Sequence, residues 1–309
     1  MTQHNWTNNY GPLLPFRVPP QSWERSGGAS SPKLSLLTLL LLLAPGQAAA
    51  QQRPLLTEDT RTVAAGSARF ELGFDFEQNR NFPLSGLNGD LSRFGVVSLT
   101  LGLGRQVEIE TGGVLQNYLS INRRYRPSAI PLTVTGNSTN DIGDFFFATK
   151  VRLVEEARRR PAIGVRFGAE LPNSNQARGI GLNRTTTFGT LLLGKTVGRW
   201  RLMGNVGMAI VPAPTNNFSQ NDPLTYSMAA TYDWTKRVTL AGEVQGRSSL
   251  RRVTPLGTES EGGVRIGARI RAVGLTWDVA ALRGYHPASP RTGMMIGVTY
   301  EGELPFLFR

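Results

Sequence analysis

The sequence predicts an all-β fold, a transmembrane antiparallel up-and-down β-barrel of about twelve strands that is preceded by a cleaved signal peptide. Three observations favour this fold. An export signal stands near the start of the chain, segments that alternate apolar with polar residues fill the part after it, and aromatic residues gather near the ends of those segments. These features are typical of barrels of the bacterial outer membrane.

The export signal fixes the compartment. Lys33 precedes an apolar run from Leu34 to Ala44, and a Pro45-Gly46 break and three small residues, Ala48-Ala49-Ala50, follow it. This order of regions is that of a signal peptide, and an apolar run of about eleven residues is too short to cross a bilayer as a helix. We expect cleavage after Ala50.

The signal divides the chain into four parts. We interpret residues 1–32 as a disordered extension or a mis-assigned start, residues 33–50 as the signal peptide, residues 51–64 as a periplasmic segment and residues 65–309 as the barrel. The chain has no cysteine, so neither a lipid anchor nor disulfides are expected, although export leads to an oxidising space. Stability must then come from strand pairing and closure.

A period of two residues marks the strands. From Ala68 to Glu77, every even position is apolar and every odd position is charged or glycine, and the same split recurs between positions 144 and 153. A charged side chain that faces lipid at mid-depth costs about 2–4 kcal/mol, whereas a watery lumen tolerates it. Twelve segments have this pattern: 65–77, 92–103, 106–119, 143–154, 161–171, 184–197, 200–211, 223–234, 237–248, 258–271, 274–285 and 292–301.

The connections and the aromatic residues give the barrel an orientation. Short links alternate with longer loops rich in Pro, Asn and Ser, which predicts short periplasmic turns, long outer loops and both termini in the periplasm. The loops 78–91 and 120–142 could fold into the lumen or stand outside as a lid. Aromatic residues should mark both membrane interfaces. The expected periplasmic belt is Trp200, Tyr232, Trp234, Trp277 and Tyr300.

The chain offers little for catalysis. Its two histidines are His4, ahead of the signal, and His286, in an expected outer loop, so the barrel wall has no Ser-His pair of the kind that hydrolases need. Glu108 and Glu110 share a strand face, but like charges in a lumen usually bind opposing Arg, so glycosidase chemistry is a weak alternative. We therefore expect no enzyme, no cofactor and no metal site. The net charge of +12 does not imply a nucleic-acid partner in an exported protein.

Charged and polar side chains on the inward strand faces are the candidate pore lining. Acids and bases are mixed in this set: Asp144, Lys150, Arg152, Arg166, Glu170, Arg201, Asn205, Glu243, Arg247, Arg265 and Arg269. The surplus of arginine falls in the loops, where it suits the phosphates of lipopolysaccharide. The expected partners are outer-membrane lipid and lipopolysaccharide, the barrel assembly machinery and a small-molecule solute.

Two functions fit this lumen. Opposite charges on facing walls could set a transverse field around a narrow pore that selects small solutes. The same charges could instead pair across the lumen and close it, which would leave a structural or lipopolysaccharide-binding barrel. We favour the pore, in the outer membrane of a Gram-negative-type bacterium.

Short motifs after Gly143 resemble one known family. Gly143-Asp144, Lys150-Val151-Arg152-Leu153, Leu171-Pro172 and the run from Gly198 to Gly207 look like the outer-membrane proteins of the MetA-pathway of phenol degradation family. The resemblance implies a barrel linked to uptake of aromatic or other hydrophobic compounds. The positions that match are Asp144, Lys150, Arg152, Trp200 and Asn205. One departure is the C-terminus, where the aromatic Phe308 is penultimate rather than last.

Overall fold

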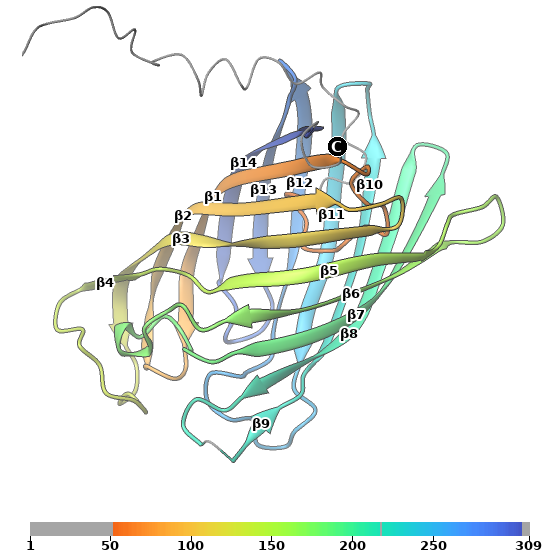
Figure 1. The fold of residues 1–309 in the computed structure, drawn as a ribbon. Coiled ribbons are helices and arrows are strands. Elements are labelled where there is room, and N and C mark those ends of the chain that lie inside the picture. Colours follow the sequence, from red (N-terminus) through yellow and green to blue (C-terminus); the bar gives the residue numbers. More distant parts are fainter. Residues whose placement is uncertain (1–51, 217, 305–309) are drawn as a thin grey trace, which may run out of the picture. The chain divides into compact units, whose positions relative to one another are not determined.

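The computed structural model describes residues 52–216 and 218–304 (Figure 1). The expected extension, signal peptide and chain end at 305–309 lie outside the described residues. Within the described part, no helix is long and apolar enough to cross a membrane.

Twelve long antiparallel strands form the wall. Each pairs with the next along the chain, and the first pairs with the last, from Ser67 opposite Glu303 to Gln78 opposite Thr292, so the sheet closes into a barrel. The prediction of a twelve-stranded up-and-down barrel is confirmed. The strands are β1 (Ser67–Phe82), β2 (Leu87–Gly102), β3 (Val107–Arg124), β5 (Phe145–Val154), β6 (Ala162–Leu171), β7 (Thr186–Val197), β8 (Trp200–Pro212), β10 (Leu224–Asp233), β11 (Val238–Ser248), β12 (Glu261–Ala272), β13 (Leu275–Gly284) and β14 (Thr292–Glu303).

The alternation in the sequence places apolar side chains outside and charged ones inside. On β1, Phe70 is 45% exposed and Leu72 is 40% exposed, whereas Arg69 and Glu71, which alternate with them, are almost completely buried. A water-soluble protein has the opposite distribution, because its charged groups stay in contact with solvent. The outer surface of this barrel is therefore suited to lipid.

The two ends of the barrel differ. We call the end where β1 begins and β14 ends the proximal end, and the opposite end the distal end. Proximal turns are mostly short, and the tightest has left-handed conformations at Val273 and Gly274, with φ of 54° and 72°. Two additional short strands, β4 (Ser138–Asp141) and β9 (Gln220–Asn221), and the 3-10 helix η1 (Gln176–Arg178) lie in distal loops.

The first distal connection differs from the expected long loop 78–91. β1 continues to Phe82 and β2 starts at Leu87, so the turn covers only residues 83–86. The added distal ends of β1 and β2 have polar residues that hide the period of two, but their backbones still pair, for example at Asn81 and Asn88. Beyond the apolar band, strand pairing is no longer accompanied by an apolar outer face. The same reason applies to β3, which runs on to Arg124.

The distal loops pack against one another. Ser85 Oγ donates to Gly179 O at 2.7 Å, and Thr133 N donates to Ala177 O at 3.0 Å. Gly257 has Leu84, Leu182 and Pro214 around its α-carbon, so four different distal loops meet at this point. Because β1 and β7 lie on different sides of the ring, loops that meet there must reach across the opening. We call these four residues the distal cap.

Candidate functional site

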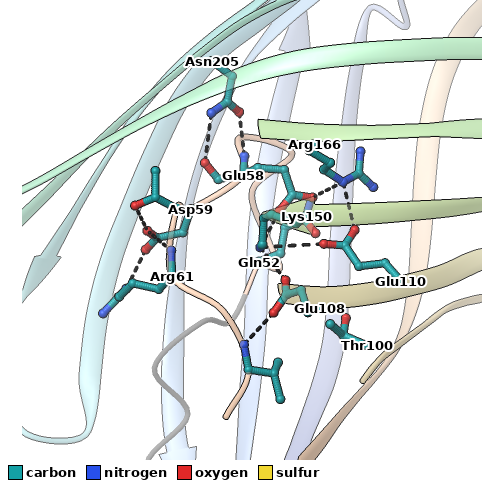
Figure 2. Close-up of polar contacts among 12 residues, drawn as sticks. Gln52, Glu58, Asp59, Arg61, Thr100, Glu108, Glu110, Lys150, Arg166 and Asn205 are labelled. Atoms are coloured by element: carbon teal, nitrogen blue, oxygen red, sulfur yellow. Dashed lines mark hydrogen bonds and ion pairs between the residues drawn. The ribbon is translucent and has the colours of Figure 1, made fainter. Parts of the chain in front are cut away.

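The chain before β1 lies inside the barrel. Residues 52–63, which we call the plug, make hydrogen bonds and ion pairs to side chains of β1, β3, β5, β6, β8, β11, β12 and β13. Figure 2 shows the part of this network that involves β3, β5, β6 and β8. The sequence had suggested a periplasmic segment at 51–64. In the described part of that segment, the backbone and acidic side chains form hydrogen bonds and ion pairs with buried charged groups of the wall.

Glu243 on β11 binds the tip of the plug. Its carboxylate accepts hydrogen bonds from Leu56 N at 2.9 Å, Thr57 N at 2.8 Å and Thr57 Oγ1 at 2.7 Å, and it also pairs with Arg265 on β12 at 3.1 Å. Beside it, Leu55 packs in a small apolar cluster on the wall, with Met203, Ala229 and Ala241. Hydrogen bonds to a charged acceptor are stronger than neutral ones, so Glu243 is a principal anchor of the plug.

Asn205 and Lys150 hold the next residue of the plug, Glu58. The Asn205 amide bonds both backbone groups, accepting from Glu58 N at 2.7 Å and donating to Glu58 O at 3.0 Å. The Glu58 carboxylate meets Lys150 and Arg166, each at 3.2 Å. Figure 2 shows these groups converging from several strands on one short stretch of chain.

Lys150 also neutralises a pair of carboxylates on β3. Its Nζ lies 2.6 Å from Glu108 and 3.7 Å from Glu110, and Arg166 Nε lies 2.9 Å from Glu110. Lys150 is 1% exposed. A buried charge of this kind is tolerated only when it is paired and hydrogen-bonded. The pair Glu108 and Glu110 therefore forms ion pairs with cations of β5 and β6.

Asp59 fixes the proximal side of the plug. Its carboxylate pairs with Arg201 on β8 and, at 2.7 Å, with Arg61, and Arg201 also lies 2.6 Å from Glu156. Glu108 accepts from Val63 N at 2.5 Å, which fixes the chain just before β1. The plug thus starts and ends in the proximal half of the barrel and rises between these points to Glu243.

The first residues of the plug also bind the wall. Arg53 pairs with Asp75 at 3.2 Å and with Asp278 at 3.4 Å. Arg269 donates to Arg53 O at 2.6 Å and to Gln52 O at 2.8 Å. Backbone carbonyl groups here use a guanidinium as their donor, so no sheet pairing is needed to hold the segment.

A cavity of about 400 Å³ lies on the distal side of the plug. Its floor includes Leu56 and Glu58, and its walls carry five arginines and two further glutamates with polar and small residues. Within the described residues these charges are paired, as in the contacts of Arg80 with Glu77 and Glu261 at 3.1 and 2.9 Å. We call this cavity the chamber; its charged residues are Glu58, Glu77, Arg80, Arg93, Arg166, Arg247, Glu261 and Arg265.

Seven of the eleven candidate lumen residues belong to the plug contacts. They are Lys150, Arg166, Arg201, Asn205, Glu243, Arg265 and Arg269. Arg265 contributes indirectly, by its ion pair with Glu243, which binds the plug.

The other four candidates lie elsewhere. Arg247 pairs with Glu261 at 2.9 Å in the chamber, and Arg152 lies near the proximal turn, 3.2 Å from Glu155. At the distal end, Asp144 accepts from Ser174 N at 2.7 Å, and Glu170 stands opposite Phe146 in the β5–β6 register. Whether any of them lines a conducting path remains a prediction.

Sequence reasoning missed the residues of the plug itself. Arg53, Glu58 and Asp59 lie between the signal and the first strand, where no periodic pattern marks a structure. The signal that could have found them is the Glu58-Asp59 pair, two adjacent acids ahead of a barrel whose inner wall has buried cations. Within the described residues, no group of three or more His, Cys, Asp or Glu side chains could hold a metal ion.

The expected aromatic belt lies at the proximal end. Trp200, Trp234 and Trp277 have about half or more of their surface exposed, and the ring centroid of Trp200 lies 4.7 Å from that of Tyr232. Tyr300 stands beside Phe70 across the seam of β1 and β14. Amphipathic rings at this height suit a membrane–water interface.

The pKa values of the two plug acids predict opposite responses to pH. Burial alone would raise the pKa of Asp59, but Arg61 and Arg201 outweigh it and hold the pKa well below its usual range. For Glu58, burial and the neighbouring Glu110 raise the pKa despite Lys150 and Arg166. Asp59 therefore stabilises docking above its ordinary pKa, and this contribution is lost as the pH falls toward its lowered value. The contribution of Glu58 is complete below its ordinary pKa and is lost as the pH rises through its raised value.

A pair of variants tests this contrast. We expect Asp59→Asn to loosen the plug at pH 7, and Glu58→Gln to leave it as tight or tighter, because the amide removes a buried charge that Glu110 repels. Trypsin cleavage after Arg61 in the folded barrel, measured from pH 5 to 8, reports the undocked fraction. Equal loosening by both substitutions would contradict the assignment.

Comparisons with known proteins agree with this architecture. The chain is similar in structure to the COG4313 outer membrane channel from Pseudomonas putida F1, with a TM-score of 0.57 and 13% identity over 79% of this chain and 97% of that one. It is also similar to the NanC porin, with a TM-score of 0.45 and 7% identity over 76% and 98% of the two chains. A search of curated proteins gives no match. The fold is that of an outer-membrane β-barrel.

A family model gives the remaining comparison. It matches residues 51–269, which begin at the residue after the expected cleavage site and include the plug and all strands up to β12. This match covers more than half of the chain and includes the residue pairs between plug and wall except those of β13 and β14. The chain belongs to the family described as "Putative MetA-pathway of phenol degradation".

Proposed function

We propose that the protein is an outer-membrane channel that passes small solutes by passive diffusion and that the plug closes it at rest. The observation that carries the proposal is the chamber of about 400 Å³ on the distal side of the plug. Polar side chains bind the plug without strand pairing, so it can leave without opening the wall. The proximal end, where β1 begins and β14 ends, is then the periplasmic end.

The lining of the chamber bears on the cargo. Family membership links the protein to aromatic compounds, but arginine and glutamate dominate the chamber walls. Such walls favour polar or charged solutes, including aromatic acids, because a neutral hydrocarbon would leave paired charges partly desolvated without replacing their hydrogen bonds. We therefore propose small polar or ionised aromatic solutes rather than pure hydrocarbons.

The alternative is a non-conducting barrel that binds lipopolysaccharide. One observation favours it: the distal cap and the plug each obstruct an end of the lumen. Exposed arginines of the distal strands and loops, such as Arg123, Arg126 and Arg251, would then bind lipid phosphates. In either case, the assembly machinery is the expected partner for insertion.

Single-channel recording separates the two functions. The refolded chain 51–309 is placed in a planar bilayer under a salt gradient, and heat-modifiable migration shows that it is folded. Discrete openings support the channel and justify screening of aromatic acids. A folded barrel that never conducts, even after trypsin has cleaved the plug, supports the structural alternative.

A double substitution tests the charges of the lumen. We expect Arg152→Ala with Arg166→Ala to shift the selectivity of the open channel toward cations, because the neighbouring Glu110 and Glu155 lose their counter-charges. The reversal potential under a salt gradient measures this shift. Arg123→Ala with Arg124→Ala, at the distal end of β3, serves as the matched control. An unchanged reversal potential in a conducting double variant would argue against a path along these residues.

A further inference from the structure

A second, smaller cavity lies at the proximal mouth of the lumen. Its volume is about 110 Å³, and it lies among the ends of β7, β8, β10, β11 and β12 and the side chain of Arg61 from the plug. Five of its lining residues are arginines and one is an acid, and threonine hydroxyls supply further donors. We call it the arginine pocket; its residues are Arg61, Thr196, Gly198, Arg199, Trp200, Arg201, Thr231, Asp233, Thr239, Arg269 and Arg271.

The nearby acids do not balance this charge. Asp59 forms ion pairs with both Arg61 and Arg201, and Glu156 forms a second ion pair with Arg201. The lining acid, Asp233, accepts from Thr239 Oγ1 at 2.7 Å. Five guanidinium groups thus face three carboxylates. Glu71 and Asp278 also act on Arg269, but Glu71 lies 3.9 Å from Arg69 and Asp278 forms an ion pair with Arg53.

Arg269 and Arg199 make their contacts with neutral groups. Arg269 donates to backbone carbonyl groups of the plug. Arg199 donates to Trp234 O and lies over the ring of Tyr232, with its guanidinium carbon 5.1 Å from the ring centroid. The guanidinium of Arg271 has no hydrogen bond or ion pair among the described residues. Like charges that converge on a small polar cavity repel one another at short range, and an anion relieves that repulsion.

We propose that the arginine pocket binds an oxyanion, a phosphate or a carboxylate group, between the plug and the barrel wall. Guanidinium groups bind such anions through paired N–H donors. The cavity has the liquid volume of roughly three to four water molecules at about 30 Å³ each, which accommodates one such group. The source is either an anionic solute at the mouth of the channel or the headgroup of a phospholipid in the adjoining leaflet.

An oxyanion in this pocket would tie the plug to the wall. Arg61 belongs to the plug, whereas Arg201, Arg269 and Arg271 belong to β8 and β12. A ligand that contacts both parts binds the docked state more tightly than the undocked state, and it therefore stabilises docking by the same free energy. This site needs the plugged barrel but not a conducting one, so it is independent of the proposed channel function.

The test uses Arg271, because its removal breaks no contact seen among the described residues. The full chain is purified from outer membranes in a non-ionic detergent, and binding of inorganic phosphate is measured by calorimetry at low ionic strength. We expect Arg271→Gln to weaken phosphate binding about tenfold, the effect of losing one hydrogen bond to a charged group. Lys236→Gln, in an exposed turn at the same end of the barrel, should leave the affinity unchanged.

Two further measurements identify the source of the ligand and test its effect on the plug. Binding of phosphate supports a soluble oxyanion, whereas binding of only a short-chain phosphatidic acid supports a lipid headgroup. In both cases the bound anion should slow trypsin cleavage after Arg61 in the wild type more than in Arg271→Gln. The proposal is overturned if neither probe binds beyond a chloride control of equal ionic strength, or if Arg271→Gln binds as the wild type does.

Discussion

A barrel that lacks residues 52–61 is expected to conduct ions several times better than the intact protein. The deleted stretch occupies the lumen at the level of Glu243, Lys150 and Arg201. A barrel of twelve strands lies in width between the eight-stranded type, which its side chains fill, and the porins of about sixteen strands, which leave an aqueous channel. Current through a pore follows its narrowest cross-section, so removal of the plug should raise the unitary conductance and lengthen the openings. Planar bilayer recording of the two proteins in the same salt measures both quantities.

A reversible disulfide cross-link between the plug and the wall is the complementary experiment. The chain has no cysteine, so Leu55→Cys together with Ala229→Cys, which share one apolar cluster, can be cross-linked without background. We expect the cross-linked protein to stay closed and the reduced protein to behave as the wild type does. Ala229→Cys alone is the control. If deletion and cross-linking both leave the conductance unchanged, the plug is not the closure.

Replacement of Glu243 should release the plug without unfolding the barrel. Glu243→Ala removes the acceptor for Leu56 N, Thr57 N and Thr57 Oγ1 and leaves Arg265 without its ion pair. Each hydrogen bond to a charged group contributes about 1.5–3 kcal/mol, and these contributions are not additive. A net loss of about 3 kcal/mol would raise the undocked fraction roughly a hundredfold.

Limited proteolysis measures that fraction, because trypsin can cut after Arg61 only when the plug is undocked. When docking is fast relative to cleavage, the rate follows the undocked population. Glu303→Ala, an exposed acid at the end of β14, should leave the rate unchanged. If Glu243→Ala is cut no faster than this control while the barrel remains heat-modifiable, Glu243 is not an anchor.

The sequence predicted the wall of the barrel and missed its contents, for a physical reason. Lipid on one side and water on the other impose the period of two that marks β1 at Phe70 and Leu72, so all twelve strands could be located. The paired acids Glu108 and Glu110 were expected to bind opposing arginine, and they bind Lys150 as well as Arg166. The plug has no such constraint, since its partners, such as Glu243, lie 186 residues away in the chain. Local pattern carries no information about a contact at that separation.

The position of the plug also determines the order of steps in the biogenesis of the protein. Residues 52–63 leave the export machinery before any strand does, yet their partners Glu243, Arg269 and Asp278 belong to β11, β12 and β13, which emerge near the end. The segment can find its full set of bonds only after nearly the whole ring exists. Its docking is therefore a late step of biogenesis, and a barrel with a missing or misregistered strand would keep this segment free and open to periplasmic proteases.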